Sequence, residues 1–226
     1  MTYTPPKPKK TDHIHTGVRA LISSVPLVGG AAIEVFNALI VPPLEKRRND
    51  WMNRIGEAIS RLEESASTNW KTLNENEIFI DTLIQASQAA LKTSVELKLE
   101  ALKNATLNAS LISIDSSLQH VFISLIDDLS EWHLKILLFL SEHVNGLMLT
   151  NQGEQDAIDF FDYTVKRNFP TLAEKKYFYM QIVRDLSSRG LIPEQPQMKA
   201  HLHVYGGITE FGIQFVNFIK SPLPQM

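Results

Sequence analysis

The chain has 226 residues, enough for one large domain or two modest ones. Hydrophobic residues make up 44% of it and charged residues 21%, as in ordinary globular proteins, and the formal net charge of -3 excludes a global basic field that would attract nucleic acid or anionic lipid. The absence of cysteine excludes disulfides, thiolate nucleophiles and cysteine-based zinc sites, and it fits a reducing cytoplasm.

The first 12 residues form a tail rich in proline and lysine. Such a tail has little apolar surface to bury, so we expect it to be disordered. Residues 17–43 then form an apolar stretch with an uncharged run of fourteen residues, Ala20–Ile33, which Pro26, Gly29 and Gly30 interrupt. Because proline and glycine break helices, we expect a hairpin of two short apolar helices folded at Val25–Gly30, with the other helices packed around it.

Two placements of this hairpin remain open: a buried core, or a contact with a membrane surface or another protein. The run is shorter than the about 20 apolar residues that span a bilayer, and the long polar leader argues against a signal peptide. The cations after the hairpin can pair with Glu45 and Asp50 or contact lipid headgroups. The candidate contact residues are Leu27, Val28, Ile33, Phe36, Leu39, Lys46, Arg47 and Arg48.

The middle of the chain has the periodicity of amphipathic helices. Pro43 suits the first turn of a helix over Leu44–Glu64, because the first turn tolerates a missing N–H. The apolar face of this helix carries Trp51, Ile55, Ile59 and Leu62.

A longer periodic segment covers residues 75–117 without glycine or proline. Asn74 and Glu77 resemble a capping box at its start. The segment predicts one long helix, or two helices with a break near Thr93 and Ser94. The expected buried stripe consists of Ile80, Ile84, Leu91, Val95, Leu102, Ala105, Ala109 and Ile112.

Further helices are expected over Ser116–Leu129, with Leu118, Val121, Phe122, Leu125 and Leu129 inward, and over Glu131–His143 behind Ser130 as a cap. The remaining elements, in order, are a helix over Glu154–Phe169, a helix over Glu174–Arg189 between a capping box (Thr171–Glu174) and Gly190, a strand over Ala200–Val204, and a helix over Ile208–Ile219 with Phe211, Phe215, Phe218 and Ile219 inward.

The order of elements over residues 130–221 resembles a winged-helix module: helix, turn, helix, "RDLSSRGLI", a small hairpin and "ITEFGIQFVNFI". In such a module Glu174–Arg189 would be the recognition helix. We expect Tyr177, Phe178 and Tyr179 to lie in the core. Winged helices also bind proteins, so a protein partner stays open. The candidate nucleic-acid contacts are Lys175, Lys176, Arg184 and Lys199.

No catalytic motif is present: the sequence has no phosphate-binding glycine loop, His-Glu-x-x-His, Gly-x-Ser-x-Gly or calcium loop. His201 and His203 share a strand face, as a metal pair could, but no third ligand accompanies them. Asp127, Asp128 and Glu131 fall at helix ends, where carboxylates serve as caps. We therefore predict a non-enzymatic protein with no catalytic residue, no metal site, no cofactor and no small-molecule substrate.

Three segments carry a wider resemblance: "VPLVGGAAIEVFNALIVPPLEKRRNDW", "ENEIFIDTLIQASQAALKTSVELKLEALKNATLNASL" and "LIDDLSEWHLKIL". They resemble a set of uncharacterised bacterial helical proteins that is similar in plan to the abortive-infection alpha family. The resemblance implies a cytoplasmic bacterial protein, an accessory to antiviral defence, without a catalytic motif.

The expected fold is therefore mainly α, with a disordered tail (1–12), a helical domain (13–129) that contains the hairpin 17–43, and a winged-helix-like domain (130–221). The expected function is that of a non-enzymatic interaction protein or effector whose apolar N-terminal segment acts on a membrane or an oligomer partner, in the cytoplasm or at a membrane surface. The alternative is a winged-helix DNA-binding regulator.

Overall fold

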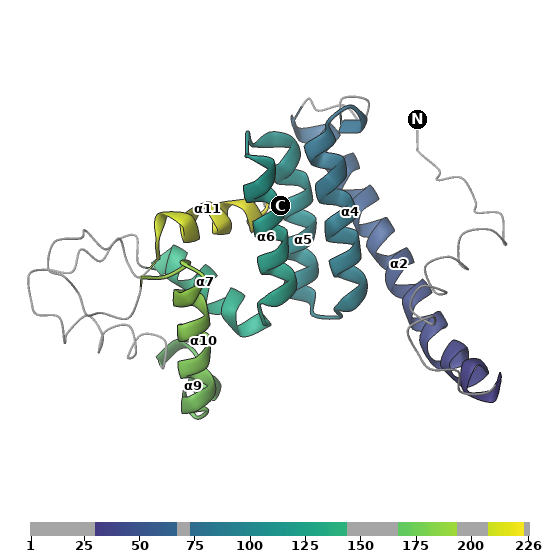
Figure 1. Cartoon of the computed structure of the whole chain (residues 1–226). Coiled ribbons are helices and arrows are strands. Elements are labelled where there is room, and N and C mark those ends of the chain that lie inside the picture. The colour runs from purple at the N-terminus through teal and green to yellow at the C-terminus, as the bar shows by residue number, and fades with distance from the viewer. Residues whose placement is uncertain (1–29, 67–72, 144–166, 194–207, 224–226) are drawn as a thin grey trace, which may run out of the picture. The chain divides into compact units, whose positions relative to one another are not determined.

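The computed structural model describes residues 30–66, 73–143, 167–193 and 208–223, and all regular structure in these residues is helical (Figure 1). The mainly α class is thus confirmed for the described part of the chain. The expected strand Ala200–Val204 and most of the expected helix Glu154–Phe169 lie outside it. The helices are α2 (Gly30–Ala66), α4 (Glu77–Lys92), α5 (Glu96–Leu111), α6 (Ser116–Asp128), α7 (Glu131–His143), α9 (Pro170–Ala173), α10 (Lys176–Ser188) and α11 (Glu210–Ile219).

The chain divides within α2 into two compact units, Met1–Lys46 and Arg47–Met226. The first unit is described only from Gly30 onward. The second unit contains the hydrophobic core, which includes residues from Trp51 to Ile219. The predicted boundary between residues 129 and 130 stays a prediction.

Helix α2 continues through Pro42 and Pro43, so the prediction that a new helix begins at Pro43 is wrong. A proline inside a helix costs about 3 kcal/mol, partly because it leaves the carbonyl four residues earlier without its N–H partner. Here those carbonyls belong to Ala38 and Leu39, which are exposed. Water can therefore hydrate both carbonyls, which lowers the cost of continuing the helix.

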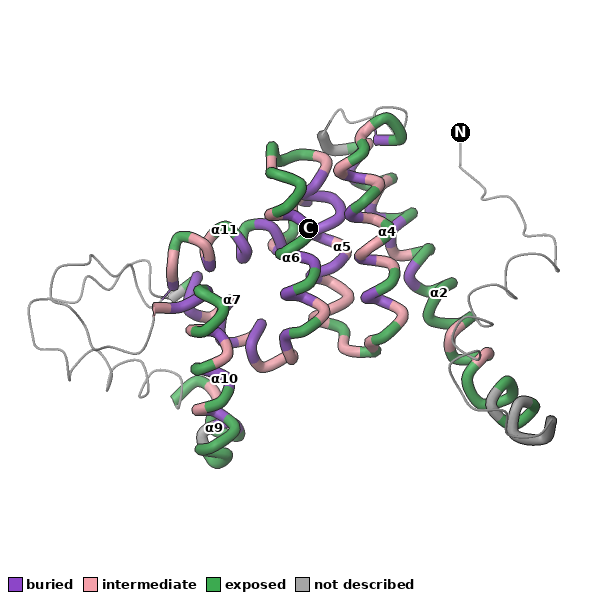
Figure 2. The backbone as a smooth tube through the Cα atoms, in the orientation of Figure 1, coloured by how far each residue is buried: buried purple, intermediate pink, exposed green. Residues whose placement is uncertain are grey.

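Helix α5 is the centre of the second unit. It packs against α4, α6, α7 and α11, and Figure 1 shows α4, α5 and α6 side by side. Its buried residues occupy most of its circumference, as Figure 2 shows: Ala101, Leu102, Asn104, Ala105, Thr106, Leu107, Asn108 and Ala109. A helix that is buried on several sides lacks the single apolar stripe that marks a surface helix.

Alanines form much of the contact between α4 and α5. Ala86, Ala89 and Ala90 of α4 are buried, as are three alanines of α5. Small side chains allow helix axes to approach closely, so the contact needs no large aliphatic residue. The predicted stripe is accordingly correct for Leu102, Ala105 and Ala109 and wrong for Ile84, which is 52% exposed, and for Ile112, which is also exposed.

The sequence predicted the break between α4 and α5 but misplaced the cap of α4. The two helices are separated by residues 93–95, which confirms the two-helix alternative. The N-cap is Asn76 rather than Asn74, and its side chain accepts a hydrogen bond of 3.0 Å from the N–H of Phe79. Asn74 is helical in a short segment that ends before this cap.

The part of α2 that belongs to the second unit packs against α4 and α5. Trp51, Ile55 and Leu62 are buried, which confirms the predicted face, and Ile59 packs against the same core. The indole Nε1 of Trp51 donates a hydrogen bond of 2.9 Å to Ser87 Oγ. This bond satisfies the one polar atom of a buried indole.

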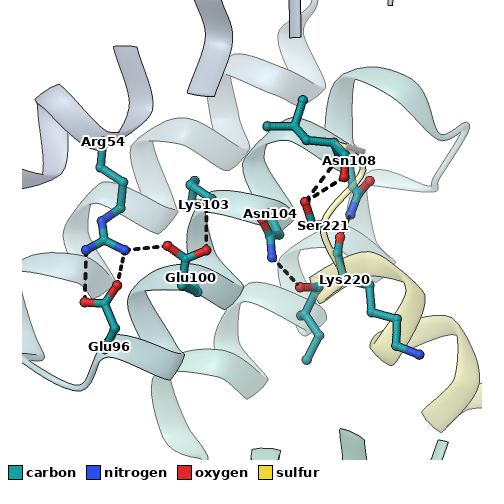
Figure 3. A network of polar contacts seen from close by, with 10 residues as sticks. Arg54, Glu96, Glu100, Lys103, Asn104, Asn108, Lys220 and Ser221 are labelled. Carbon is teal, nitrogen blue, oxygen red and sulfur yellow. Dashed lines mark hydrogen bonds and ion pairs between the residues drawn. The ribbon is translucent and has the colours of Figure 1, made fainter. Parts of the chain in front are cut away.

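A polar network fixes α2 and α11 to α5 (Figure 3). Arg54 donates to both carboxylate oxygens of Glu96, at 2.5 and 2.9 Å, and to Glu100 at 2.6 Å, while Lys103 also pairs with Glu100. The hydrogen bond to Glu96 is the main cause that raises the pKa of Arg54, and the same bond lowers the pKa of Glu96. Both ionised forms are therefore stabilised in the folded state.

Phenylalanines join α6 to α11. The ring of Phe122 lies 5.4–5.5 Å from the rings of Phe211, Phe215 and Phe218. Phe215, Phe218 and Ile219 are buried as predicted, and Phe211 is half-buried. In α6 the prediction is correct for Phe122, Leu125 and Leu129, but Leu118 is half-buried and Val121 is exposed.

The core that the structure describes lies in the second unit. No residue before Trp51 belongs to the core that the structure describes. The described helices of the second unit bury their apolar faces against one another, so they need no apolar hairpin between them. Residues 17–29 lie outside the described residues and Gly30–Pro43 belong to the first unit, so the expectation that the other helices pack around residues 17–43 stays a prediction.

Candidate functional site

The first candidate site is the apolar surface at the start of α2. Val35, Leu39 and Ile40 are 58%, 65% and 39% exposed. Ile33 and Phe36 also lie on α2, and Leu27 and Val28 fall outside the described residues. Val35 and Ile40 were missed from the predicted contact set, although a continuous helix through the prolines would have placed them beside Leu39.

The cations after this surface differ in their surroundings. Arg47 Nη1 donates a hydrogen bond of 3.2 Å to the backbone oxygen of Leu91, near the end of α4, where carbonyls lack helical partners. Lys46 and Arg48 are exposed, and Arg48 has no ion pair within the described residues. The three predicted contact cations thus do not act as one group, because Arg47 helps to fix α2 to α4.

The second candidate site is the exposed side of α10. Lys175, Lys176 and Arg184 are exposed, whereas Lys199 falls outside the described residues. None of the three has an ion pair in the described part of the chain, nor has Arg167, which is also exposed. Elsewhere most described cations are paired, as Arg54, Lys92, Lys103, Lys135, Arg189 and Lys220 are.

The charge around α10 is opposite in sign to that of the whole chain. Between residues 167 and 188, which include all of α10, the four cations stand against two acids, Glu174 and Asp185, which gives a local formal charge of +2. The whole chain has a formal net charge of -3. A local patch of this sign can attract a polyanion even though the net charge cannot.

Two aromatic side chains lie on the same surface. Tyr177 is 87% exposed and Phe178 is 42% exposed, so the prediction that they lie in the core is wrong. It is correct for Tyr179, which is buried. Successive helical residues turn by about 100°, so three in a row cannot all face the core. The buried face of α10 consists of Tyr179, Ile182, Val183 and Leu186.

The N-terminus of α10 lacks the predicted capping box. Thr171 lies inside α9, and the N-cap of α10 is Lys175, whose side chain makes no capping hydrogen bond. Unpaired N–H groups and the helix dipole give such an end a partial positive charge. The C-terminal prediction is correct, because Gly190 follows the helix with a positive φ of 72°.

The acidic residues between α6 and α7 form ion pairs. Asp127 pairs with Lys92 at 2.6 Å, and its backbone oxygen accepts a hydrogen bond of 2.7 Å from Lys98. Asp128 pairs with Arg189 at 3.2 Å. These contacts tie the end of α6 to α4, α5 and α10, and Glu131 similarly pairs with Lys135 within α7.

Ser130, His133 and Asp185 bring together the three residue types of a hydrolase triad. Ser130 Oγ lies 2.7 Å from His133 Nδ1, and His133 Nε2 lies 3.4 Å from Asp185 Oδ2. The backbone N–H of Ser130 also donates to Nδ1, at 3.2 Å. In a capping box, the third-position side chain bonds back to the N–H of the cap residue in this way. The lone pair that a general base would use is thus already engaged, and we interpret the group as the cap of α7.

His133 is buried and lies beside Asp185. Burial lowers its pKa and outweighs the opposing attraction of Asp185. No group of three or more metal-ligating side chains lies within the described residues. His201 and His203, the pair singled out in the sequence, fall outside them.

No match was found when the chain was compared with family models, with curated proteins and with solved structures. The resemblance to helical bacterial proteins similar in plan to the abortive-infection alpha family therefore stays a prediction. Within the described residues, no helix combines the length and the apolar character that crossing a membrane requires.

Proposed function

We propose that the chain is a non-enzymatic interaction protein and that the start of α2 binds its partner, which is a membrane surface or a second copy of the chain. The observation that supports the proposal is the exposure of Val35, Leu39 and Ile40 on one helix. Full burial of such a side chain is worth about 1.5–3 kcal/mol. These residues take no part in the described core, so a partner that covers them gains this free energy without disturbing the fold.

The two partners make different use of the neighbouring cations. An interfacial helix lies in the membrane plane with its apolar residues among the acyl chains and its cations near anionic headgroups. The exposed side chains of Lys46 and Arg48 follow the apolar surface and suit this arrangement. A second copy of the chain would instead pair the two apolar surfaces by symmetry, and the cations would stay in water.

The family resemblance supplies the biological setting of the proposal. It would make the protein a cytoplasmic bacterial effector and an accessory to antiviral defence by abortive infection. The molecular proposal does not depend on this setting, since it follows from the exposed surface of α2.

A double substitution tests the proposal. Val35→Glu with Leu39→Glu places two charges on the candidate surface, and Ile84→Glu with Val121→Glu places two on exposed apolar positions of α4 and α6 as a control. Co-sedimentation with vesicles, with and without anionic lipid, and light scattering after size exclusion measure the two partners. We expect the first variant alone to lose vesicle binding or self-association. Wild-type protein that is monomeric and leaves both kinds of vesicle unbound would contradict the proposal.

A second candidate function is a winged-helix regulator that binds duplex DNA through α10. It is supported by the exposed cations Lys175, Lys176 and Arg184, which lack ion pairs in the described residues. Lys199, the fourth predicted contact, falls outside the described residues. Because phosphate contacts release counterions, such binding should weaken steeply with salt. A gel shift compares wild type with Lys175→Glu, Lys176→Glu; absence of salt-sensitive duplex binding by the wild type excludes this function.

A further inference from the structure

Two aromatic rings of α10 are exposed, and binding of a DNA duplex does not account for them. Tyr177 and Phe178 are the aromatic members of the set of large hydrophobic side chains that are exposed in the described part of the chain. Burying an aromatic ring is favourable, and the ring of Tyr177 is left 87% exposed. These rings are therefore available to a partner with flat apolar faces.

The rings lie among cations. Tyr177 and Arg184 are seven residues apart, which places them on the same face of α10 two turns from each other. Lys176 and Phe178 flank Tyr177 on its two sides, since successive residues turn by about 100°. Lys175 stands at the helix N-terminus, which has no side-chain cap. The two rings thus lie between two cations at the start of the helix, Lys175 and Lys176, and Arg184 two turns along it.

We propose that this surface, made of Lys175, Lys176, Tyr177, Phe178 and Arg184, binds single-stranded nucleic acid. The bases stack on the two rings, and the cations contact the phosphates. This proposal rests on the second candidate function for its cations but assigns a different ligand to the site. Single-strand binding sites combine a positively charged path for the backbone with aromatic side chains on which unpaired bases stack.

Duplex DNA fits the same surface less well. Its bases are already stacked on each other, so the rings would gain no partner from a regular duplex. Base edges in a groove are read by side chains such as arginine, asparagine and glutamine. The exposed glutamine of α10, Gln181, instead donates a hydrogen bond of 2.7 Å to Asp185 Oδ1. The free polar groups of this face are cations, which contact phosphates without reading sequence.

Fluorescence anisotropy tests the proposal with a labelled single-stranded oligonucleotide of mixed sequence, as DNA and as RNA, and with the corresponding duplex. The variants are Tyr177→Ala with Phe178→Ala, and Lys176→Glu. The matched controls are Val121→Ala, an exposed apolar residue of α6, and Arg61→Glu, an exposed cation of α2 without an ion pair in the described residues. Circular dichroism confirms that each variant is folded.

We expect the ring variant to weaken single-strand binding by about thirtyfold or more, because it removes two stacking rings and stacking contributes about 1–3 kcal/mol per base. Its effect on duplex binding should be small. Lys176→Glu should weaken binding and reduce its dependence on salt. Both controls should bind as the wild type does.

Two results would overturn the proposal in different ways. If the wild type binds the duplex and the ring variant binds both ligands normally, the stacking surface is refuted while the duplex regulator stands. If the wild type binds neither ligand, both assignments for α10 fall. The proposal for α2 is independent of either result, because it is measured with vesicles and by oligomeric state.

Discussion

Replacing Asn108 by alanine should destabilise the protein through α11, although Asn108 itself lies on α5. Its side-chain amide donates to three backbone oxygens at the end of α11: Phe218 and Lys220 at 2.8 Å and Asn217 at 3.3 Å. The last carbonyls of a helix have no partner within the helix. Asn108 therefore acts as a cap supplied by a neighbouring helix.

The magnitude follows from which of these oxygens can reach water. The bond to Phe218 is buried, whereas those to Asn217 and Lys220 are partly buried. A buried acceptor that loses its partner costs about 1–3 kcal/mol, and the two other oxygens can be partly hydrated. Alanine recovers about 0.5 kcal/mol because it favours helix more than asparagine does. With a small contribution from the two partly hydrated oxygens, we expect a net loss of about 1–2.5 kcal/mol in the free energy of unfolding.

Urea unfolding followed by far-UV circular dichroism measures this loss, and native-state hydrogen exchange locates it. Amides of α11 should exchange faster in the variant, while those of α4 should change less. Asn217→Ala is the control, since its side chain is exposed and its backbone oxygen remains. If Asn108→Ala unfolds within about 0.5 kcal/mol of the wild type, as substitutions on the surface do, the capping role is refuted.

Three further predictions concern packing and charge. Gly212→Ala should cost about 1–3 kcal/mol or more, because the Cβ of the new alanine would lie 2.2 Å from the backbone oxygen of Leu191. Gly56→Ala places its Cβ in open space and should stabilise the helix by about 0.5–1 kcal/mol. Thermal unfolding compares the two variants. Stability should fall as the pH drops below 6.5, because the pKa of His133 in the folded protein lies under that ordinary value and the unfolded chain takes up the proton first. In urea melts at a series of pH values, the free energy of unfolding should depend less on pH for His133→Gln than for the wild type. An equal dependence on pH would contradict the assignment to His133. Arg54→Gln should cost about 0.5–1 kcal/mol in low salt, since the pair is partly exposed, and less in high salt; a loss independent of salt would indicate packing instead of charge.

The sequence predicted the positions of several helices, but it did not show that α5 is the central one. The apolar periodicity and glycine positions identified α6, α7, α10 and α11, and the polar residues near Thr93 identified the end of α4. Helix α5 was not recognised as central, because its contacts are made by alanines and by buried Asn104 and Asn108. Such residues carry no strong apolar signal, and their role depends on carbonyls more than 100 residues away.

The caps and the proline pair show why local rules were insufficient elsewhere. Asn74 and Asn76 are the same residue type two positions apart, and the residue that caps α4 is Asn76, which accepts from the N–H of buried Phe79. The Pro42–Pro43 pair would normally end a helix, yet the exposed carbonyls before it can be hydrated. In each case the outcome depends on which groups face water, and local sequence rules do not contain that information.

The sequence identified the cations of the α10 site but not its exposed aromatic rings. The cations of α10 were identified from composition, but the exposure of Tyr177 and Phe178 required the phase of the helix. That phase was available in the spacing of Tyr179, Ile182, Val183 and Leu186, which lie on one helical face.

The exposed apolar side chains at the start of α2 contribute little to the described core. An apolar residue can contribute to the stability of its own chain only where that chain covers it. Leu39 is 65% exposed, and the described core contains no residue before Trp51. The free energy available from covering Leu39 and its neighbours is therefore left to a contact outside that core. The exposed cations of α10, Lys175, Lys176 and Arg184, are a comparable case for charge. Cations without ion pairs in the described residues add little to stability but remain available to an anionic ligand.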